Sequence, residues 1–154
     1  MSDLEQRLHD DLTAAMRERD ELTVATLRMA LTAISNEKVA GKAARELDDD
    51  EVVAVLSREA KKRRESQTAY AEAGRPELAE REAAEGEVLA RYLPAPLGQD
   101  ELAALIAAAV AQAKAQGLDG PKAMGPVMKV LTPQVAGRAD GAAVAAAVRT
   151  ALAG

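Results

Sequence analysis

Apolar residues recur along the whole chain at the three- and four-residue spacing of an amphipathic α-helix. Near the N-terminus this pattern covers residues 4–16, and a second run with the same spacing covers residues 24–34. No stretch alternates apolar and polar residues with the β-branched composition that is typical of a strand. The pattern therefore predicts an all-α protein.

Polar residues at the expected helix starts support this interpretation. Ser2 and Glu5 have the spacing of a capping box, in which a side chain at each position bonds the backbone of the other. Asp48 and Glu51 have the same spacing at the start of a third helix. Asp20 is suited to cap the second helix. These signals predict three helices before residue 70.

The segment from Tyr70 to Leu97 joins this third helix to a fourth. Gly74 stands just past a helix end and Pro76 at the first position of the next helix, which is typical of two antiparallel helices. The fourth helix is expected from Pro76 to about Leu93. The sequence therefore predicts a long antiparallel helical hairpin over residues 50–93.

Beyond Pro94 and Pro96 the chain becomes rich in alanine and nearly neutral. This part contains three further helical patterns, over residues 102–113, 124–135 and 144–152. We expect an N-terminal helical domain over residues 1–94, followed by a small three-helix C-terminal lobe over residues 95–154.

The composition excludes several kinds of functional site. The 154 residues include no cysteine, so disulfides, thiol nucleophiles, iron–sulfur clusters and cysteine-based zinc sites are excluded. The charged N-terminus lacks the apolar segment of a secretory signal, and no run approaches the roughly 18 apolar residues of a membrane span. We expect a soluble, cytoplasmic protein that contacts no membrane.

The net charge is −5 and is divided unevenly along the chain. Residues 1–94 carry 15 basic and 21 acidic side chains, whereas residues 95–154 carry 5 and 4. A nucleic-acid-binding protein usually has an overt basic surface, and this sequence does not predict one. We therefore expect no binding to DNA, and any contact with RNA is expected to be local and of modest affinity.

The most basic segment, residues 61–64, has two interpretations. It is an obvious candidate for RNA contact. However, folding the hairpin back on itself brings Arg64 opposite Glu85, and in the same register Lys62 lies opposite Glu87. A charge-matched hairpin therefore explains the run better than an RNA-binding patch does. Exposed pairs contribute only about 0–1 kcal/mol each, so they set register more than stability.

No catalytic or metal site is evident in the sequence. His9 lies beside the leucines of the first helix, with no second histidine and no cysteine to complete a metal site. The glutamates of the fourth helix scatter around it, as on a solvated or salt-bridged surface. The chain contains no nucleophile elbow, P-loop or dinucleotide-binding glycine motif. We therefore predict no catalytic residue, no metal and no cofactor.

A subtler candidate for RNA contact lies in the C-terminal lobe. Lys122, Gly125 and Lys129 fall on one side of a helix, because seven residues make about two turns. Glycine would let a phosphodiester backbone approach closely between the two cations. Arg138 lies in the next turn and adds a third cation. These four residues are the predicted RNA-binding candidates.

The turn that holds Arg138 also has a purely structural explanation. Gly137 is suited to end one helix in the left-handed conformation, and Asp140 is suited to cap the next helix. An acidic cap makes the N-terminus of that last helix a poor phosphate site. The spacing alone leaves both interpretations open.

Five short motifs, taken in order, resemble those of the GatB/YqeY family. They are Thr26-Leu27-Arg28-Met29, Ala73-Gly74-Arg75-x-x-Leu78-Ala79-x-x-Glu82, Tyr92-Leu93-Pro94-x-x-Leu97, Met124-Gly125-x-Val127-Met128 and Gly137-Arg138-Ala139-Asp140-Gly141-x-x-Val144. The resemblance covers essentially the whole chain. It departs at Pro126, where a polar or basic residue is common, which removes a cation and could tighten or kink that helix.

The resemblance implies a helical N-terminal domain and a three-helix lobe. In this family the same module forms the tail of the B subunit of the glutamine-dependent tRNA amidotransferase, where it helps to hold tRNA while Glu-tRNA or Asp-tRNA is amidated. Stand-alone members resemble that tail without its kinase and ammonia-transfer chemistry. The family label of carbon–nitrogen ligase activity with glutamine as amido-N-donor therefore describes the larger enzyme.

Three functions remain open at this point. The leading one is a non-catalytic accessory protein that binds tRNA weakly and with strong salt dependence, through Lys122, Gly125, Lys129 and Arg138. Its partners would be tRNA and a tRNA-modifying or aminoacylating enzyme. The second is a helical protein-interaction adaptor that docks through the hairpin and binds no RNA. The third, an amide-forming enzyme in its own right, is disfavoured by the missing nucleophile and nucleotide site.

Overall fold

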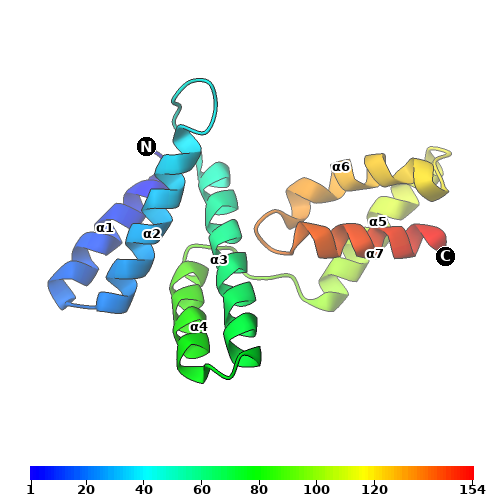
Figure 1. The fold of residues 1–154 in the computed structure, drawn as a ribbon. Helices are drawn as coiled ribbons and strands as arrows, with labels where there is room; N and C mark the ends of the chain where they lie inside the picture. The colour runs from blue at the N-terminus through cyan, green and yellow to red at the C-terminus, as the bar shows by residue number, and fades with distance from the viewer. The chain divides into compact units, whose positions relative to one another are not determined.

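The computed structural model describes residues 1–154 and consists of seven α-helices and one short 3₁₀ helix, with no strand (Figure 1). The elements are α1 (Asp3–Glu18), α2 (Glu21–Lys38), α3 (Asp49–Glu72), α4 (Pro76–Ala90), α5 (Gln99–Ala115), the 3₁₀ helix η1 (Gly120–Ala123), α6 (Met124–Val135) and α7 (Gly141–Ala153). The prediction of an all-α protein is therefore confirmed. None of the helices combines the length and the apolar composition that a membrane crossing requires.

The helices form two compact units, Met1–Leu93 and Pro94–Gly154, each with its own apolar core. With no Phe or Trp in the chain, both cores are built mainly from aliphatic side chains. The fully buried residues of the first unit include Leu8, Leu27, Ile34, Leu56 and Leu89. Those of the second unit include Val127, Leu131, Val144 and Val148.

The two predicted capping boxes have different outcomes. At the start of α3 the box is complete: the Glu51 N–H donates to Asp48 at 2.8 Å, and the Asp48 N–H donates to Glu51 at 3.0 Å. At the start of α1 the Glu5 N–H donates to Ser2, but the Glu5 carboxylate accepts instead from Lys38 Nζ at 2.8 Å. A charge-assisted bond to Lys38 is stronger than one to a backbone N–H, so half of this box is replaced by a link between α1 and α2.

The hairpin of α3 and α4 turns at Gly74, whose φ of 72° is a left-handed conformation that favours glycine (Figure 1). Pro76 occupies the first turn of α4, as predicted. The expected end of this helix at about Leu93 is wrong, because α4 ends at Ala90. Beyond it the N–H groups of Tyr92 and Leu93 bond carbonyls only three residues back, in tighter turns than those of an α-helix.

Tyr92 fastens the chain after α4 to α1. Its hydroxyl donates to Asp11 Oδ2 at 2.6 Å, and the Arg7 guanidinium lies 4.7 Å from the centre of its ring. Arg7 Nη2 also donates to the carbonyl of Arg91 at 3.4 Å. Burial, together with the hydrogen bond to Asp11, raises the pKa of the Tyr92 phenol well above its ordinary value. The neutral phenol is therefore the form that stabilises this contact.

Replacing Tyr92 with Phe removes the donor to Asp11. We expect the free energy of unfolding of this unit near neutral pH to fall by about 1–2 kcal/mol. Because the pKa of Tyr92 is raised on folding, its contribution is complete below the unfolded pKa of about 10 and is lost as the pH rises above that value. Urea denaturation followed by circular dichroism should show a steeper alkaline loss of stability in the parent protein than in Tyr92→Phe.

Tyr70→Phe is the matched control for this experiment. Tyr70 is the other tyrosine, and its hydroxyl makes no hydrogen bond in the structure. This variant should keep the parent's alkaline profile. An alkaline loss in Tyr92→Phe equal to that of the parent would show that the hydroxyl does not supply the pH-dependent stability.

Candidate nucleic-acid interface

Arg63 lies among three carboxylates in the middle of the α3/α4 hairpin. Its Nη1 is 3.3 Å from Glu85 and 3.5 Å from Glu82, both on α4, and its Nη2 is 3.6 Å from Glu59 on its own helix. The Arg63 side chain is 17% exposed and the three glutamate side chains 9–15%. This largely buried ion cluster fixes the alignment of the two helices.

The predicted pairs of the basic run are wrong, although the hairpin is charge-matched. Arg64 is exposed and makes no ion pair, and Lys62 bonds Glu59 of its own helix at 3.0 Å instead of Glu87. Arg63 takes the inner position because it is seven residues beyond the buried Leu56, on the side of α3 that faces the core. Within this run, Arg63 is therefore the cation that joins α3 to the carboxylates of α4.

Lys122, Gly125 and Lys129 are the residues that the spacing predicts on one side of a helix. All three are exposed, but they do not belong to one continuous α-helix, because Lys122 is in η1 and the other two are in α6. A 3₁₀ turn superposes residues three apart, and an α-helix brings residues four apart to one face. Spacings of three and four residues are therefore still compatible with one side, and we call these three residues the lysine row.

The charge on this row is not neutralised within the molecule. Neither Lys122 nor Lys129 makes a hydrogen bond or an ion pair. No acidic residue occurs between Asp119 and Asp140, so their own segment offers them no carboxylate. A Cβ added at Gly125 would meet no atom within 4 Å. The space over Gly125 is therefore open to a ligand, and packing does not require the glycine.

Arg138 is placed differently from the two lysines. Its Nε donates to the carbonyl of Ala95 at 3.0 Å, its Nη2 lies 3.6 Å from Glu101, and its own carbonyl accepts from Leu97 at 2.9 Å. It therefore holds the segment before α5 against the turn after α6. The 12 residues of α6, about 18 Å of helix, separate it from Lys122. With its side chain 35% exposed, Arg138 is available to a ligand only in part.

The structural interpretation of the turn at Arg138 is consistent with its geometry in part. Gly137 has a φ of 73°, the left-handed conformation expected at this helix end. Asp140 occupies the N-cap position of α7, but its side chain makes no capping hydrogen bond there, so this part of the prediction is wrong. Pro126 lies in the first turn of α6, where its missing N–H would have no partner within the helix. Pro126 therefore removes no hydrogen bond from α6.

Other side chains that could act in catalysis or metal binding do not gather into a second site. His9 is exposed on α1. No set of three or more His, Cys, Asp or Glu residues is placed to hold a metal ion. On α4, Glu82 and Glu85 contribute to the Arg63 cluster, and Arg81 also bonds Glu85 at 3.2 Å. These carboxylates are engaged in holding the hairpin together.

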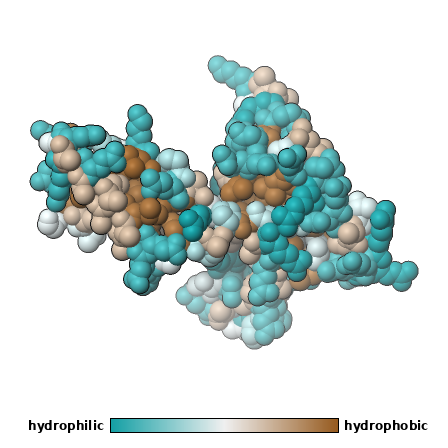
Figure 2. Space-filling view, turned by 180° about the vertical axis from the view of Figure 1, so that it is seen from behind, coloured by the Kyte–Doolittle hydropathy of each residue, from teal (hydrophilic) through white to brown (hydrophobic).

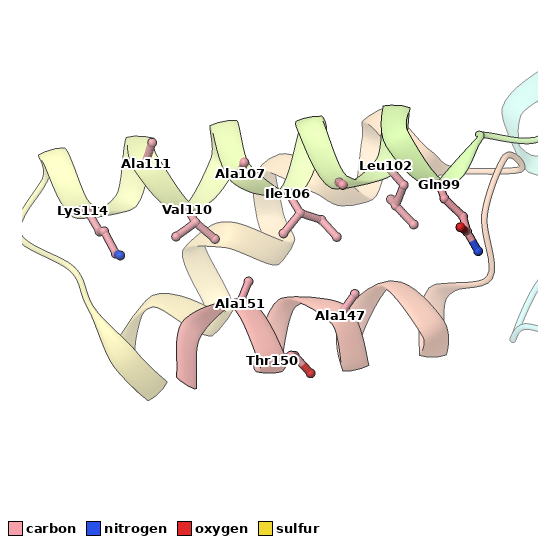
Figure 3. A pocket seen from close by; sticks show the side chains of 11 residues that line it. Gln99, Leu102, Ile106, Ala107, Val110, Ala111, Lys114, Ala147, Thr150 and Ala151 are labelled. Carbon is pink, nitrogen blue, oxygen red and sulfur yellow. The ribbon is translucent and has the colours of Figure 1, made fainter. Parts of the chain in front are cut away.

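One surface was missed in the sequence, an apolar groove of about 600 Å³ between α5 and α7. Figure 3 shows residues of both helices along it. The signal that could have revealed it is the absence of charge from residue 102 to residue 113. Over these residues Gln112 is the one polar side chain that the helix can turn toward water.

Comparison with known proteins gives one finding about the chain as a whole. A family model described as Yqey-like protein matches residues 5–152. The match therefore spans the hairpin of the first unit and the lysine row of the second. A comparison with curated proteins found no match.

Arg63 and Arg64 offer a matched pair of variants that tests the hairpin register. Arg63→Met leaves the glutamates without their shared cation, and we expect the free energy of unfolding to fall by about 2–4 kcal/mol. Arg64→Met removes an exposed arginine without an ion pair, and the change should stay within about 0.5 kcal/mol. Urea denaturation followed by circular dichroism measures both. Equal losses would contradict the inner position of Arg63.

Proposed function

The chain belongs to the YqeY-like family, and we propose that it is a non-catalytic helical accessory protein that binds tRNA. The observation that carries the proposal is the exposed row of Lys122, Gly125 and Lys129. Two cations without partners flank open space, and the segment has no acidic residue. Lysines presented in this way suit RNA phosphates, which position a nucleic acid without reading its bases.

The choice of tRNA as the ligand rests on the family resemblance. The module resembles the tail of the amidotransferase B subunit, which helps to hold tRNA during amidation. The carbon–nitrogen ligase label belongs in this proposal to the larger enzyme, and the stand-alone chain supplies binding alone. A tRNA-modifying or aminoacylating enzyme is the partner that such an accessory protein would serve.

The geometry predicts weak binding. Two lysines supply two phosphate contacts, and Arg138 adds a lesser one because Glu101 shares its guanidinium. The first unit adds no overt basic surface, because it is acidic overall and its hairpin uses Arg63 internally. We expect a dissociation constant of about 10⁻⁶–10⁻⁴ M near physiological salt, tightening as salt is lowered.

The test is fluorescence anisotropy with labelled tRNA over a series of salt concentrations. The double variant Lys122→Gln/Lys129→Gln should bind roughly tenfold more weakly at low salt, equivalent to about 1.4 kcal/mol. The slope of log affinity against log salt should also fall by about 2, since each lysine contributes about one phosphate contact.

A second double variant controls for net charge. Lys114→Gln/Arg149→Gln removes two exposed cations of the same unit that also lack ion pairs. It should leave the affinity and the salt slope close to those of the parent. Equal weakening by both double variants would contradict a localised RNA site on the lysine row.

A protein-interaction adaptor without RNA binding is the second candidate, favoured by the net charge of −5. A net negative charge opposes association with a polyanion at long range. This candidate predicts no change in tRNA anisotropy even at low salt. The same titration therefore separates the two functions.

A further inference from the structure

Two helices of the second unit present apolar sides to the solvent. From Leu102 to Ala113 α5 has no charged residue, and in α7 the polar side chains are those of Arg149 and Thr150. A surface helix normally has a polar outer face, whereas a helix that is apolar all round is normally buried. Brown apolar patches are open at the surface in Figure 2. The unit's own core leaves part of these two helices uncovered.

The groove lies between these two helices, and its lining combines exposed alanines with Ile106 and Val110, which belong to the unit's core and are 6% and 9% exposed. Figure 3 shows Leu102, Ile106 and Val110 of α5 directed toward α7, with Ala147 and Ala151 opposite them. The lining runs from Gln99 to Lys114. This part of α5 is about 22 Å long, or roughly four turns of helix. A straight apolar groove of this length and about 600 Å³ can take the apolar side of one more helix.

Small side chains at the edges of the groove favour a helix as its occupant. Ala103, Ala107 and Ala111 succeed one another at four-residue intervals along α5 and are exposed. Alanine loses no rotamer freedom when it is covered and lets a second backbone come close. A helix seated there would make a fourth helix beside the three α-helices of the unit, a common bundle arrangement.

Charge complementarity defines the occupant further. Lys114 is the one charged residue that lines the groove, it lies at one end, and it makes no ion pair or hydrogen bond. Polar groups elsewhere in the lining come from Gln99 and Thr150. An occupant that matches this pattern is apolar along its length and acidic at the end beside Lys114. An RNA backbone, charged throughout, does not match it.

We propose that the groove between α5 and α7 binds an amphipathic helix of a partner protein. This helix has about four turns, carries large aliphatic residues on one side, and has an Asp or Glu at the end that meets Lys114. The inference does not depend on RNA binding, because the groove lining excludes Lys122 and Lys129. It also differs from docking through the α3/α4 hairpin.

The test uses the full chain and a labelled designed helical peptide of about four turns. The peptide carries leucines at helical spacing on one side and a glutamate at one end. Ala107→Glu places a carboxylate in the groove, and Ala108→Glu places one on an exposed position that does not line it. Anisotropy should show at least about tenfold weaker binding for Ala107→Glu and little change for Ala108→Glu.

Reversing the charges provides a stricter readout. Lys114→Glu should weaken binding of the glutamate peptide and restore binding of a peptide whose terminal glutamate is replaced by lysine. A variant that has merely lost its fold would bind neither peptide. No binding of the glutamate peptide by the parent, equal effects of Ala107→Glu and Ala108→Glu, or no charge rescue would each overturn the proposal.

A second copy of this chain is the competing occupant. Sedimentation analysis of the parent and Ala107→Glu decides this point without any peptide. We expect the parent to be monomeric at the concentrations used for anisotropy. A parent dimer that Ala107→Glu converts to a monomer would overturn the partner-protein proposal and assign the groove to self-association.

Discussion

The arrangement of the first unit depends on one guanidinium inside a charged hairpin. Beyond Ala60, α3 has no aliphatic side chain larger than alanine, so apolar packing cannot align its outer half with α4. Arg63 does so by joining Glu59 on its own helix to Glu82 and Glu85 on α4. An ion cluster contributes less net stability than its charges suggest, because each group is desolvated. Its directional contacts nevertheless select one register.

That register determines what the end of α4 can reach. With α4 aligned on α3, Val88 and Leu89 enter the core. The chain beyond α4 then brings Tyr92 to Asp11 and Arg7 on α1. A helix that contributes few apolar residues is thus held at both ends, by a charged cluster toward the turn and by a buried phenol at its exit. The first unit uses much of its charge in such internal links.

The second unit is held together in the opposite way. It has few charged residues, and its core is an aliphatic cluster of α5, η1, α6 and α7. Few carboxylates are present to neutralise its cations, which leaves Lys122 and Lys129 without partners. The same shortage of polar residues leaves an apolar groove between α5 and α7. One compositional feature therefore produces both candidate surfaces.

Local signals in the sequence predicted most of the fold, and contacts between distant residues accounted for the errors. The Asp48 cap, the helix end before Gly74 and the left-handed Gly137 depend on neighbouring residues, so the pattern indicated them correctly. The predicted pairs of Arg64 and Lys62 were wrong because they were taken from the turn alone, whereas the seven-residue spacing from the buried Leu56 turns Arg63 inward. The partner of the Glu5 carboxylate was predicted wrongly because the observed partner, Lys38, lies 33 residues away in the sequence. The bond from Arg138 to Ala95 could not be predicted for the same reason.

The lysine row could be predicted from spacing because it depends on the order of residues along one segment. The groove was missed because helical periodicity identifies the residues that turn inward, whereas a docking surface consists of apolar residues left outside. The two surfaces also have a combined consequence. In the proposed function two phosphate contacts would bind RNA weakly, and a partner held in the groove that touched the same RNA would make the second contact intramolecular. For a short connection, the effective concentration that governs this second contact is of the order of millimolar. Weak binding by the lysine row would then be sufficient for an accessory protein, since the affinity would belong to the assembly.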